Sequence, residues 1–455
     1  MLRLAGAQVE CLFDLGLPVD VPELPADLAV IDGLLDDPAL LEPVVAAWDA
    51  RARKHGRPSI PIDRYVRLMV IKTRTGWGYE TLLREVSDSL HLRRFCRIAL
   101  TERVPDESTI RKLTRRLGPE VIDEITRLVI GREVREKRFV ARAVRVDSTV
   151  VEADVRYPND AALAADATRV LAREAKKVAG LAGNRGRAVR DRSRAAARKL
   201  REISRTVARR TGEAKTTVLR LTGEAGELAK RSTGETRRLA QQLRVRARGR
   251  GAQAKLAAGR RLDELADRAD KIARQIDQRL AGEQITDRLV SMFDPDARPI
   301  RKGKLRAPTE FGYVFQLAEI TENTRRGARG LLLPAATNLG NPTEDTLLAT
   351  TAGELKRLAV TPRDVALDAG FNPGPTATAL ADAERVFITG RQSTGSRHTD
   401  RRLAKYRVGC EGRISHLKRR YGARRSRLKG QDGARTTVGW TALTYNLDTL
   451  AIRTA

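Results

Sequence analysis

The chain has 455 residues, with 87 Lys or Arg against 57 Asp or Glu, and its net charge at pH 7 is +30. Such an excess of positive charge predicts a polyanionic partner, most simply nucleic acid. The length suggests about three domains, at roughly 150 residues each. Apolar residues make up 41% of the chain, which is enough for a buried core and excludes wholesale disorder.

Cysteine usage and hydropathy exclude further classes of protein. Cys11, Cys96 and Cys410 are far apart and form no CxxC pair, which argues against a disulfide scaffold or a Cys-rich zinc site. No run of about 18 apolar residues exists, so we expect no membrane-spanning helix. We therefore expect a soluble protein of a reducing, intracellular compartment.

The positive charge is unevenly distributed along the chain. Residues 1–50 carry a net charge of −9, residues 51–160 carry +9, residues 161–290 carry +18 and residues 291–455 carry +12. We expect the acidic N-terminal segment, residues 1–54, to be a solvated cap, although it would also be suited to screening a basic groove.

Residues 55–135 read as a compact helical domain. Pro61 suits a first helical turn, residues 76–79 form a turn, and Asp106 or Ser108 caps a helix over residues 110–117. Short helices with a basic last helix resemble a helix-turn-helix bundle, although any small helical bundle looks similar. The candidate DNA contacts exposed by the last helix are Arg111, Lys112, Arg115 and Arg116.

Residues 161–295 read as a separate basic helical segment. Residues 161–290 contain no proline and no aromatic residue, and their apolar residues recur at steps of three, four and seven. We expect several helices that form an arm or hairpin without a large core of its own. Its basic face is either simply solvated or in contact with nucleic acid.

The remaining segments, 136–160 and 296–455, predict a mixed α/β sheet. The expected strands cover residues 142–151, 311–318, 330–334, 364–371 and 385–390. A helix is expected over residues 343–358, and a final, strongly basic helix beginning near Gly409.

Three acids in this region lie where an acid is costly or unexpected. Asp147 interrupts an apolar, β-branched strand, where a charge needs a partner or a metal. Asp368 ends a short apolar strand next to glycine, a favoured place for a catalytic group. Glu411 is one of only two acids in residues 397–429, a stretch with 13 basic residues, so it is either a metal ligand or a salt-bridge partner of Arg407 or Arg413.

This order of acids resembles that of the DDE transposases of bacterial insertion sequences. The segments that carry the resemblance are 146–149, 366–371 and 407–418, the last with Arg-x3-Glu-x6-Lys spacing through Arg407, Glu411 and Lys418. A related branch has a tyrosine three residues before that arginine, where this chain has Ala404. The resemblance covers about residues 58–160 and 300–450, so residues 161–295 would be an insertion.

The resemblance implies a ribonuclease-H-like catalytic domain that binds two Mg²⁺ or Mn²⁺ ions. Asp147 would bridge both ions, and Asp368 and Glu411 would each complete one. It also implies binding of terminal inverted repeats, metal-dependent hydrolysis at the ends, strand transfer to target DNA, and a homodimer on DNA in the bacterial cytoplasm, associated with the nucleoid. The basic residues of the last helix that would contact DNA are Arg407, Arg413 and Lys418.

Other interpretations stay open at this stage. Asp364, Asp154 and Asp160 compete for the role of the second acid. A tyrosine recombinase would use His398 and Arg401, spaced His-x-x-Arg, with Tyr421 or Tyr445 as nucleophile, but such domains are mainly helical. A non-catalytic DNA-binding remnant of a transposase would carry the same charge.

Overall fold

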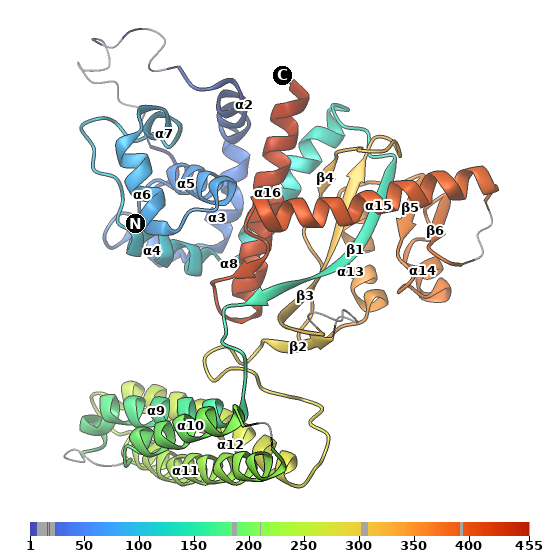
Figure 1. The fold of residues 1–455 in the computed structure, drawn as a ribbon. Coiled ribbons are helices and arrows are strands. Elements are labelled where there is room, and N and C mark those ends of the chain that lie inside the picture. Colours follow the sequence, from blue (N-terminus) through green and yellow to red (C-terminus); the bar gives the residue numbers. More distant parts are fainter. Residues whose placement is uncertain are drawn as a thin grey trace. The chain divides into compact units, whose positions relative to one another are not determined.

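The computed structural model describes residues 1–6, 16, 18, 23–183, 189–209, 211–301, 308–391 and 395–454, so Cys11 lies outside the described residues. The chain forms two compact units (Figure 1). One comprises Met1–Asp154 and Tyr313–Ala455, and the other comprises Val155–Gly312. Among the helices described, none combines the length and the apolar character needed to cross a bilayer.

The N-terminal part of the first unit is helical, as expected. The helix α5 begins after Pro61 and ends at Gly76, whose φ of 74° is a left-handed conformation that glycine adopts readily. Asp106 is the N-cap of α8, and its carboxylate accepts the Ser108 backbone N–H at 2.8 Å. The helices are α2 (Ala26–Leu35), α3 (Glu42–Ala47), α4 (Ala50–Lys54), α5 (Ile62–Thr75), α6 (Tyr79–Asp88), α7 (Leu90–Phe95) and α8 (Glu107–Arg135), with a 3-10 turn η1 (Pro38–Leu41).

Two acids of the N-terminal segment are held by an internal arginine. Arg67 of α5 is fully buried, and its guanidinium lies 2.7 Å from Asp32 and 2.8 Å from Asp36, both at the C-terminal end of α2. Because a buried guanidinium requires a counter-charge, these acids pack α2 onto α5. This part of the acidic segment therefore belongs to the helical domain and is not a freely solvated cap.

The mixed sheet has the strand order β2-β3-β1-β5-β6, with β4 also paired to β3 and β7 to β1. β1 runs parallel to β5, and β5 runs parallel to β6, whereas β3 is antiparallel to β2 and β4. The expected strands are confirmed, and two short ones were not predicted, β2 and β7. The strands are β1 (Ala143–Ala153), β2 (Arg298–Arg301), β3 (Thr309–Thr321), β4 (Leu331–Leu332), β5 (Asp364–Leu367), β6 (Arg385–Ile388) and β7 (Arg425–Ser426).

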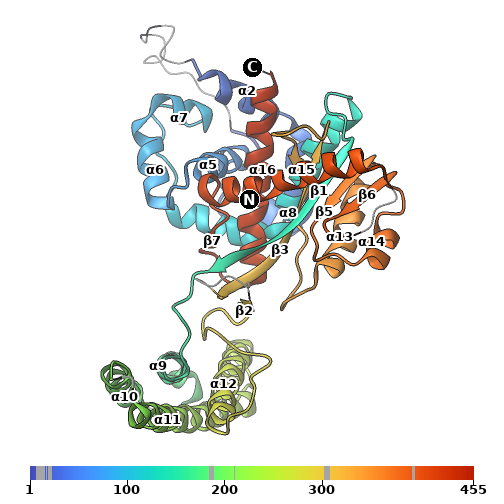
Figure 2. The ribbon, with the colours of Figure 1, turned by 45° about the vertical axis from the view of Figure 1, so that its right-hand side comes forward.

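Side chains alternate between the two faces of this sheet. Val144 and Val365 belong to a large core that also includes residues of α8, of α13 (Glu344–Arg357) and of α16 (Gly430–Thr454). Ala143 and Ala366 face the other way, toward Tyr406 of α15 (Arg397–Arg420). Figure 2 shows α15 lying across β1, β5 and β6. A short helix, α14 (Pro373–Ala379), connects β5 to β6.

The helix that carries Glu411 begins earlier than the sequence predicts. It starts at Arg397, where the Ser396 hydroxyl accepts the Thr399 backbone N–H at 3.2 Å, and not near Gly409. Its first three turns are so rich in arginine that their apolar face, Leu403 and Tyr406, is hard to recognise. It is also not the final helix, because the largely buried α16 follows it.

In its described residues, the second unit is a bundle of four helices, and the expectation that it lacks a large core of its own is wrong. Two buried clusters run through it, built mainly from alanine, leucine and isoleucine. Small residues permit the close packing: a Cβ on Gly226 would lie 3.1 Å from Ile276. The prediction missed this core because it was based on large apolar residues, whereas the core is rich in alanine. The helices are α9 (Asp160–Val178), α10 (Ser193–Val207), α11 (Gly212–Val245) and α12 (Ala252–Leu280), with a 3-10 turn η2 (Ala179–Ala182).

Candidate active site

Asp147 lies in the middle of β1 on the face that α15 covers. Alternation along the strand places it on the same side as Arg145, two residues earlier. Its Oδ1 accepts the backbone N–H of Ser148 at 2.8 Å. Burial raises the pKa of Asp147, the Ser148 hydrogen bond opposes this, and the nearby Asp368 raises the pKa further. The carboxylate therefore lies in a partly buried, acidic environment.

Asp368 follows β5 directly and lies beside Asp147. The parallel register pairs Ala143 with Asp364 and Arg145 with Ala366. Continuing that register by two residues places Asp368 next to Asp147, at the point where β5 ends. The two acids are 221 positions apart in the sequence, yet the sheet makes them neighbours.

Two residues of α15, Arg407 and Glu411, lie close to these two aspartates. Arg407 lies between the acids, with Nη1 3.3 Å from Asp368 Oδ1 and Nη2 2.8 Å from Glu411 Oε1. Although burial opposes it, the hydrogen bond to Glu411 and the charge of Asp368 raise the pKa of Arg407. Of the two predicted roles for Glu411, the structure shows the salt bridge to Arg407, and Glu411 also lies near the two aspartates.

A fourth acid at this site, Glu344, was not predicted from the sequence. It opens α13, and its Oε2 is buried without a hydrogen-bond partner. Burial raises the pKa of Glu344, Asp147 and Asp368 raise it further, and the nearby Ser148 hydroxyl opposes the shift, although it makes no hydrogen bond to Oε2. Its carboxylate presses against Gly370, where a Cβ would collide with it, which explains why glycine follows Asp368 so closely.

A buried ionic network lies beneath the site and fixes α15 on the sheet. Arg145 and Glu319 form a fully buried ion pair at 2.5 Å, and Glu319 also binds Arg413 of α15 at 3.0 Å. Tyr445 of α16 donates a hydrogen bond to Glu319 at 3.1 Å. Gly409 passes directly over the Arg145 guanidinium, where any side chain would clash. This arrangement holds Glu411 close to Asp147.

Comparison with known protein families matches two regions of the chain. Residues 20–116 match a transposase domain of the DUF772 type, and residues 327–447 match a transposase DDE domain. These two matches support an insertion-sequence DDE transposase. Searches of curated proteins and of solved structures found no significant match.

The matched segments fit the geometry of this transposase. The DDE match includes Asp368, Glu411 and Glu344, and the first match covers the helices from α2 to the first part of α8. The sheet order and the helices on its two faces agree with the expected ribonuclease-H-like class, with a helical N-terminal region.

The other candidates for the second catalytic acid are held in different ion pairs or lie elsewhere in the fold. Asp364 is fully buried and binds Arg385 at 2.7 Å and Arg402 at 3.2 Å, so it joins β5 to its neighbours. Asp160 is buried in the four-helix unit against Arg288 at 2.6 Å. Asp154 follows the end of β1 and is exposed.

The donor set at the site suits a hard divalent cation. Mg²⁺ prefers carboxylate oxygens, and the buried, unpartnered Oε2 of Glu344 adds an acceptor beside Asp147 and Asp368. In the described part of the chain, however, no three acids, histidines or cysteines converge as a ready-made metal centre. Arg407 occupies the space between Asp368 and Glu411.

The candidate DNA-binding residues differ in their burial and in their partners. Arg413 is turned inward onto Glu319 and lies over the Tyr445 ring, so it positions α15. Lys418 is half-buried near the end of the same helix, two turns beyond Glu411. Arg111, Lys112, Arg115 and Arg116 are all exposed on α8.

The residues of the tyrosine-recombinase interpretation do not form a nucleophilic site. Tyr421 is buried and donates to Asp448 at 2.7 Å, and Tyr445 is buried against Glu319. Burial raises the pKa of both hydroxyls. His398 and Arg401 lie exposed at the start of α15. The phenols are therefore structural, and this interpretation is set aside.

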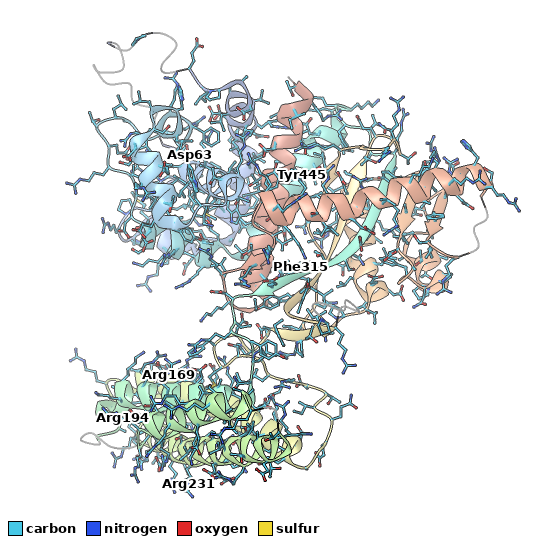
Figure 3. All side chains as sticks on the ribbon, viewed as in Figure 1. Asp63, Arg169, Arg194, Arg231, Phe315 and Tyr445 are labelled. Atoms are coloured by element: carbon cyan, nitrogen blue, oxygen red, sulfur yellow. The ribbon has the colours of Figure 1, made fainter. Side chains whose placement is uncertain are left out.

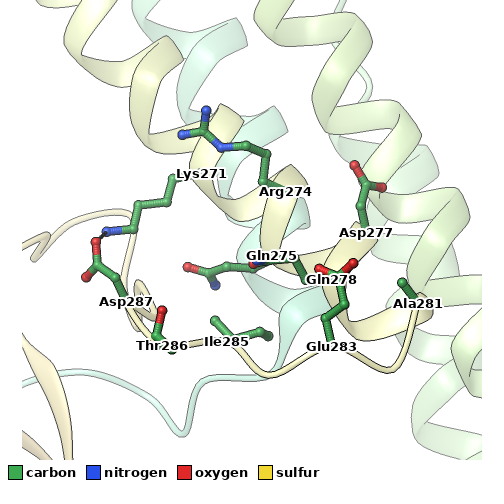
Figure 4. A pocket seen from close by; sticks show the side chains of 10 residues that line it. All are labelled: Lys271, Arg274, Gln275, Asp277, Gln278, Ala281, Glu283, Ile285, Thr286 and Asp287. Atoms are coloured by element: carbon green, nitrogen blue, oxygen red, sulfur yellow. Dashed lines mark hydrogen bonds and ion pairs between the residues drawn. The ribbon is translucent and has the colours of Figure 1, made fainter.

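A polar hollow on the four-helix unit is a structural feature of its own (Figure 4). It lies between the last turns of α12 and the segment that follows. Gln275 donates to the Leu289 carbonyl at 3.2 Å and accepts the Leu289 N–H at 2.6 Å. Lys271 forms an ion pair with Asp287. These contacts tie the segment to the helix and account for the polar lining.

Proposed function

We propose that this transposase binds the terminal inverted repeats of its element, cleaves the ends by metal-dependent phosphodiester hydrolysis, and joins them to target DNA by strand transfer. The observation that carries the proposal is the meeting of Asp147, Asp368 and Glu411, which come from two strands and a helix far apart in the sequence. A rigid sheet is suited to holding such a set, because catalytic groups need fixed mutual positions.

In this proposal, Asp147, Asp368 and Glu411 would hold a pair of divalent cations, Mg²⁺ or Mn²⁺. Such a pair stabilises the attacking and the leaving oxygens of an in-line displacement. Asp147, which interacts with both other acids, suits the bridging position. The protein's own contribution is to exclude water from the inner side of Asp147 and to fix Glu411 through the Arg145–Glu319–Arg413 network.

Arg407 and Lys418 supply positive charge on the same helix. Arg407 is 12% exposed and neutralises Asp368 and Glu411 in the absence of other cations. Lys418, two turns beyond Glu411, is suited to holding a DNA phosphate. Because paired ends need two active sites, we propose that the protein acts as a dimer on DNA.

The alternative is a non-catalytic DNA-binding remnant, which the positive charge supports equally well. The presence of the acidic cluster argues against this alternative. A cluster of partly buried acids repels DNA phosphates and costs stability, so without a catalytic role it would be a liability for a DNA-binding protein.

Nicking of a supercoiled plasmid that carries the DNA flanking the coding region tests the proposal. Wild-type protein should nick the plasmid with Mg²⁺ and not with EDTA. Asp147→Asn, Asp368→Asn and Glu411→Gln should each reduce nicking by at least about a thousandfold, because each removes a charge that would hold metal. Binding of the same DNA in EDTA should persist in all three variants.

Glu384→Gln is the matched control, because Glu384 is an exposed acid beside β6, away from the cluster. It should nick as wild type does. Wild-type binding without any nicking would favour the remnant, and full activity in one of the three variants would remove that acid from the site.

A further inference from the structure

The most basic helix of the four-helix unit is also its shortest. α10 carries five basic residues and one acid over 15 residues, a net charge of +4. The net charge is +1 for α9, +3 for α11 and +2 for α12, which are 19, 34 and 29 residues long. Of the four helices, α10 therefore has the highest net positive charge per residue.

Four arginines of α10 form a single stripe along the helix. Arg194, Arg198, Arg201 and Arg205 are spaced by four, three and four residues, so they lie within one narrow sector of an α-helix. All four are exposed, and Arg194 is among the side chains labelled in Figure 3. The opposite side of the helix carries Ala196 and Ile203, which are buried in the bundle.

The arginines of the stripe differ from several other arginines of the unit in having no ion-pair partner in the described part of the chain. On the other helices, some exposed arginines are paired, such as Arg237 with Asp267 and Asp270, and Arg261 with Glu264. Others, including Arg231 and Arg238 of α11, are exposed and form no ion pair with any residue that the structure describes, but they do not form a row of four. The remaining basic residue of α10, Lys199, is bound to Glu224 of α11. Among the described residues, the four stripe arginines form no ion pair. Hydrogen bonds from Ser193 lower the pKa of Asp191, and the charge of Arg194 adds to this shift.

We propose that this stripe, Arg194, Arg198, Arg201 and Arg205, binds the phosphate backbone of double-stranded DNA. The stripe is about 16 Å long at 1.5 Å per residue, comparable to about five base pairs. Four unpaired guanidiniums in a row suit a regular row of phosphates, each of which accepts bidentate hydrogen bonds. Contacts to backbone phosphates carry no sequence information directly, so the proposed contact is sequence-independent.

This inference depends on the proposed function in one respect only, which is that DNA is the partner. The stripe belongs wholly to the four-helix unit, whereas the acidic cluster belongs to the other unit. Binding and cleavage can therefore be separated experimentally, since binding is measured in EDTA and nicking in Mg²⁺.

The test compares two full-length variants that lose the same charge. In the stripe variant, Arg194, Arg198, Arg201 and Arg205 are all changed to Gln. In the control variant, the four ion-paired arginines Arg169, Arg220, Arg237 and Arg261 are changed to Gln. Fluorescence anisotropy in EDTA, over a series of NaCl concentrations, gives the salt dependence of binding to a duplex of flanking DNA and to a scrambled duplex.

The stripe variant should show a log–log salt slope that is flatter by about 0.9 for each phosphate that the protein no longer neutralises, up to about 3.6, on both duplexes. The control variant should change the slope by less than about 0.9, the value for a single phosphate. A third variant, with all four stripe arginines changed to Lys, retains the charge and should restore most of the slope. Circular dichroism melting of the two stripe variants should match that of the wild type, because the stripe is exposed and, within the described residues, unpaired. The control variant loses the exposed ion pairs of four arginines, so its melting temperature should fall slightly, because each such pair contributes little to stability.

Three results would overturn the inference. The first is an unchanged salt slope in the stripe variant, and the second is an equally flattened slope in the control variant. The third is a loss of self-association in the stripe variant at an unchanged slope, which would make the stripe a protein contact. If the slope is unchanged while wild-type protein still nicks the plasmid, only this inference fails. If wild-type protein neither binds nor nicks DNA, the proposed function fails.

Discussion

The Nη1 atom of Arg407 lies 3.3 Å from the Oδ1 atom of Asp368, so that the guanidinium occupies the centre of the acidic site. A salt bridge of the same arginine to Glu411 completes the arrangement. Arg407 thus neutralises acids that would otherwise repel one another, and a bound cation would take over that role. Stability and metal binding at this site are therefore coupled through a single side chain.

The first prediction concerns this coupling. Arg407→Met should lower the melting temperature in EDTA, by the equivalent of about 1 kcal/mol, because Asp368 and Glu411 are largely solvated and their pairing is screened. Millimolar Mg²⁺ should then raise the melting temperature more in the variant than in the wild type. Differential scanning fluorimetry measures both. An equal Mg²⁺ effect in the two proteins would show that Arg407 and the cation do not compete.

Asp147 and Asp368 could be predicted from the sequence, because each is a charged residue within or at the end of an apolar strand. It could not predict Glu344, since an acid just after Thr343 looks like ordinary helix capping. The start of α15 was missed because arginines outnumber the apolar residues of its first turns, and the core of the four-helix unit because alanine gives a weak periodic signal. Contacts between residues far apart in the chain, such as Glu319 with Arg145, have no local signature at all.

The second prediction concerns Glu344. Glu344→Gln should reduce Mg²⁺-dependent nicking by about 10- to 100-fold, as expected for a group that supports metal ligands. It should also diminish the rise in melting temperature that Mg²⁺ produces, which is a readout independent of activity. The reason is that its buried Oε2 lies beside Asp147 and Asp368 without a partner. Unchanged nicking and an unchanged Mg²⁺ shift would make Glu344 a purely structural residue.

The third prediction concerns the pH dependence of stability. Burial raises the pKa of Asp147 above 3.8, so the folded state binds this proton more tightly than the unfolded chain does. The contribution of Asp147 to the free energy of unfolding therefore falls as pH rises from about 3.8 through the folded pKa, and at pH 7 the charge destabilises the fold. Asp147→Asn should raise the melting temperature at pH 7 in EDTA and should not raise it at acidic pH. A lower melting temperature at pH 7 would contradict this.

The fourth prediction concerns the buried network. Glu319→Gln should destabilise the protein by about 3–5 kcal/mol, because Arg145 would be left buried without a full counter-charge. Glu322→Gln is the control: it breaks a partly exposed pair with Arg453 on the same segment and should cost about 0–1 kcal/mol. Urea unfolding of both variants gives the comparison. Similar destabilisation in the two would show that the network does not fix α15.

The last prediction concerns end recognition by the basic helix α8. The structure separates the four candidate contacts: Arg111 is paired with Glu107 at 3.0 Å, and the Arg116 guanidinium lies 3.8 Å over the Trp48 ring. Lys112 and Arg115, one turn apart on the exposed face, have no such partner among the described residues and are best suited to enter a groove.

Lys112→Gln and Arg115→Gln should therefore each weaken binding to the flanking duplex, by about 1–3 kcal/mol if the side chain reads a base. For a base contact the weakening should exceed that on a scrambled duplex, whereas a phosphate contact should weaken both equally. Arg116→Gln should mainly lower thermal stability, because the contact with Trp48 is worth about 0.5–1 kcal/mol. If Arg116→Gln weakened end binding more than Arg115→Gln did, the helix would face DNA through its other side, and the groove-facing pair would have to be reassigned.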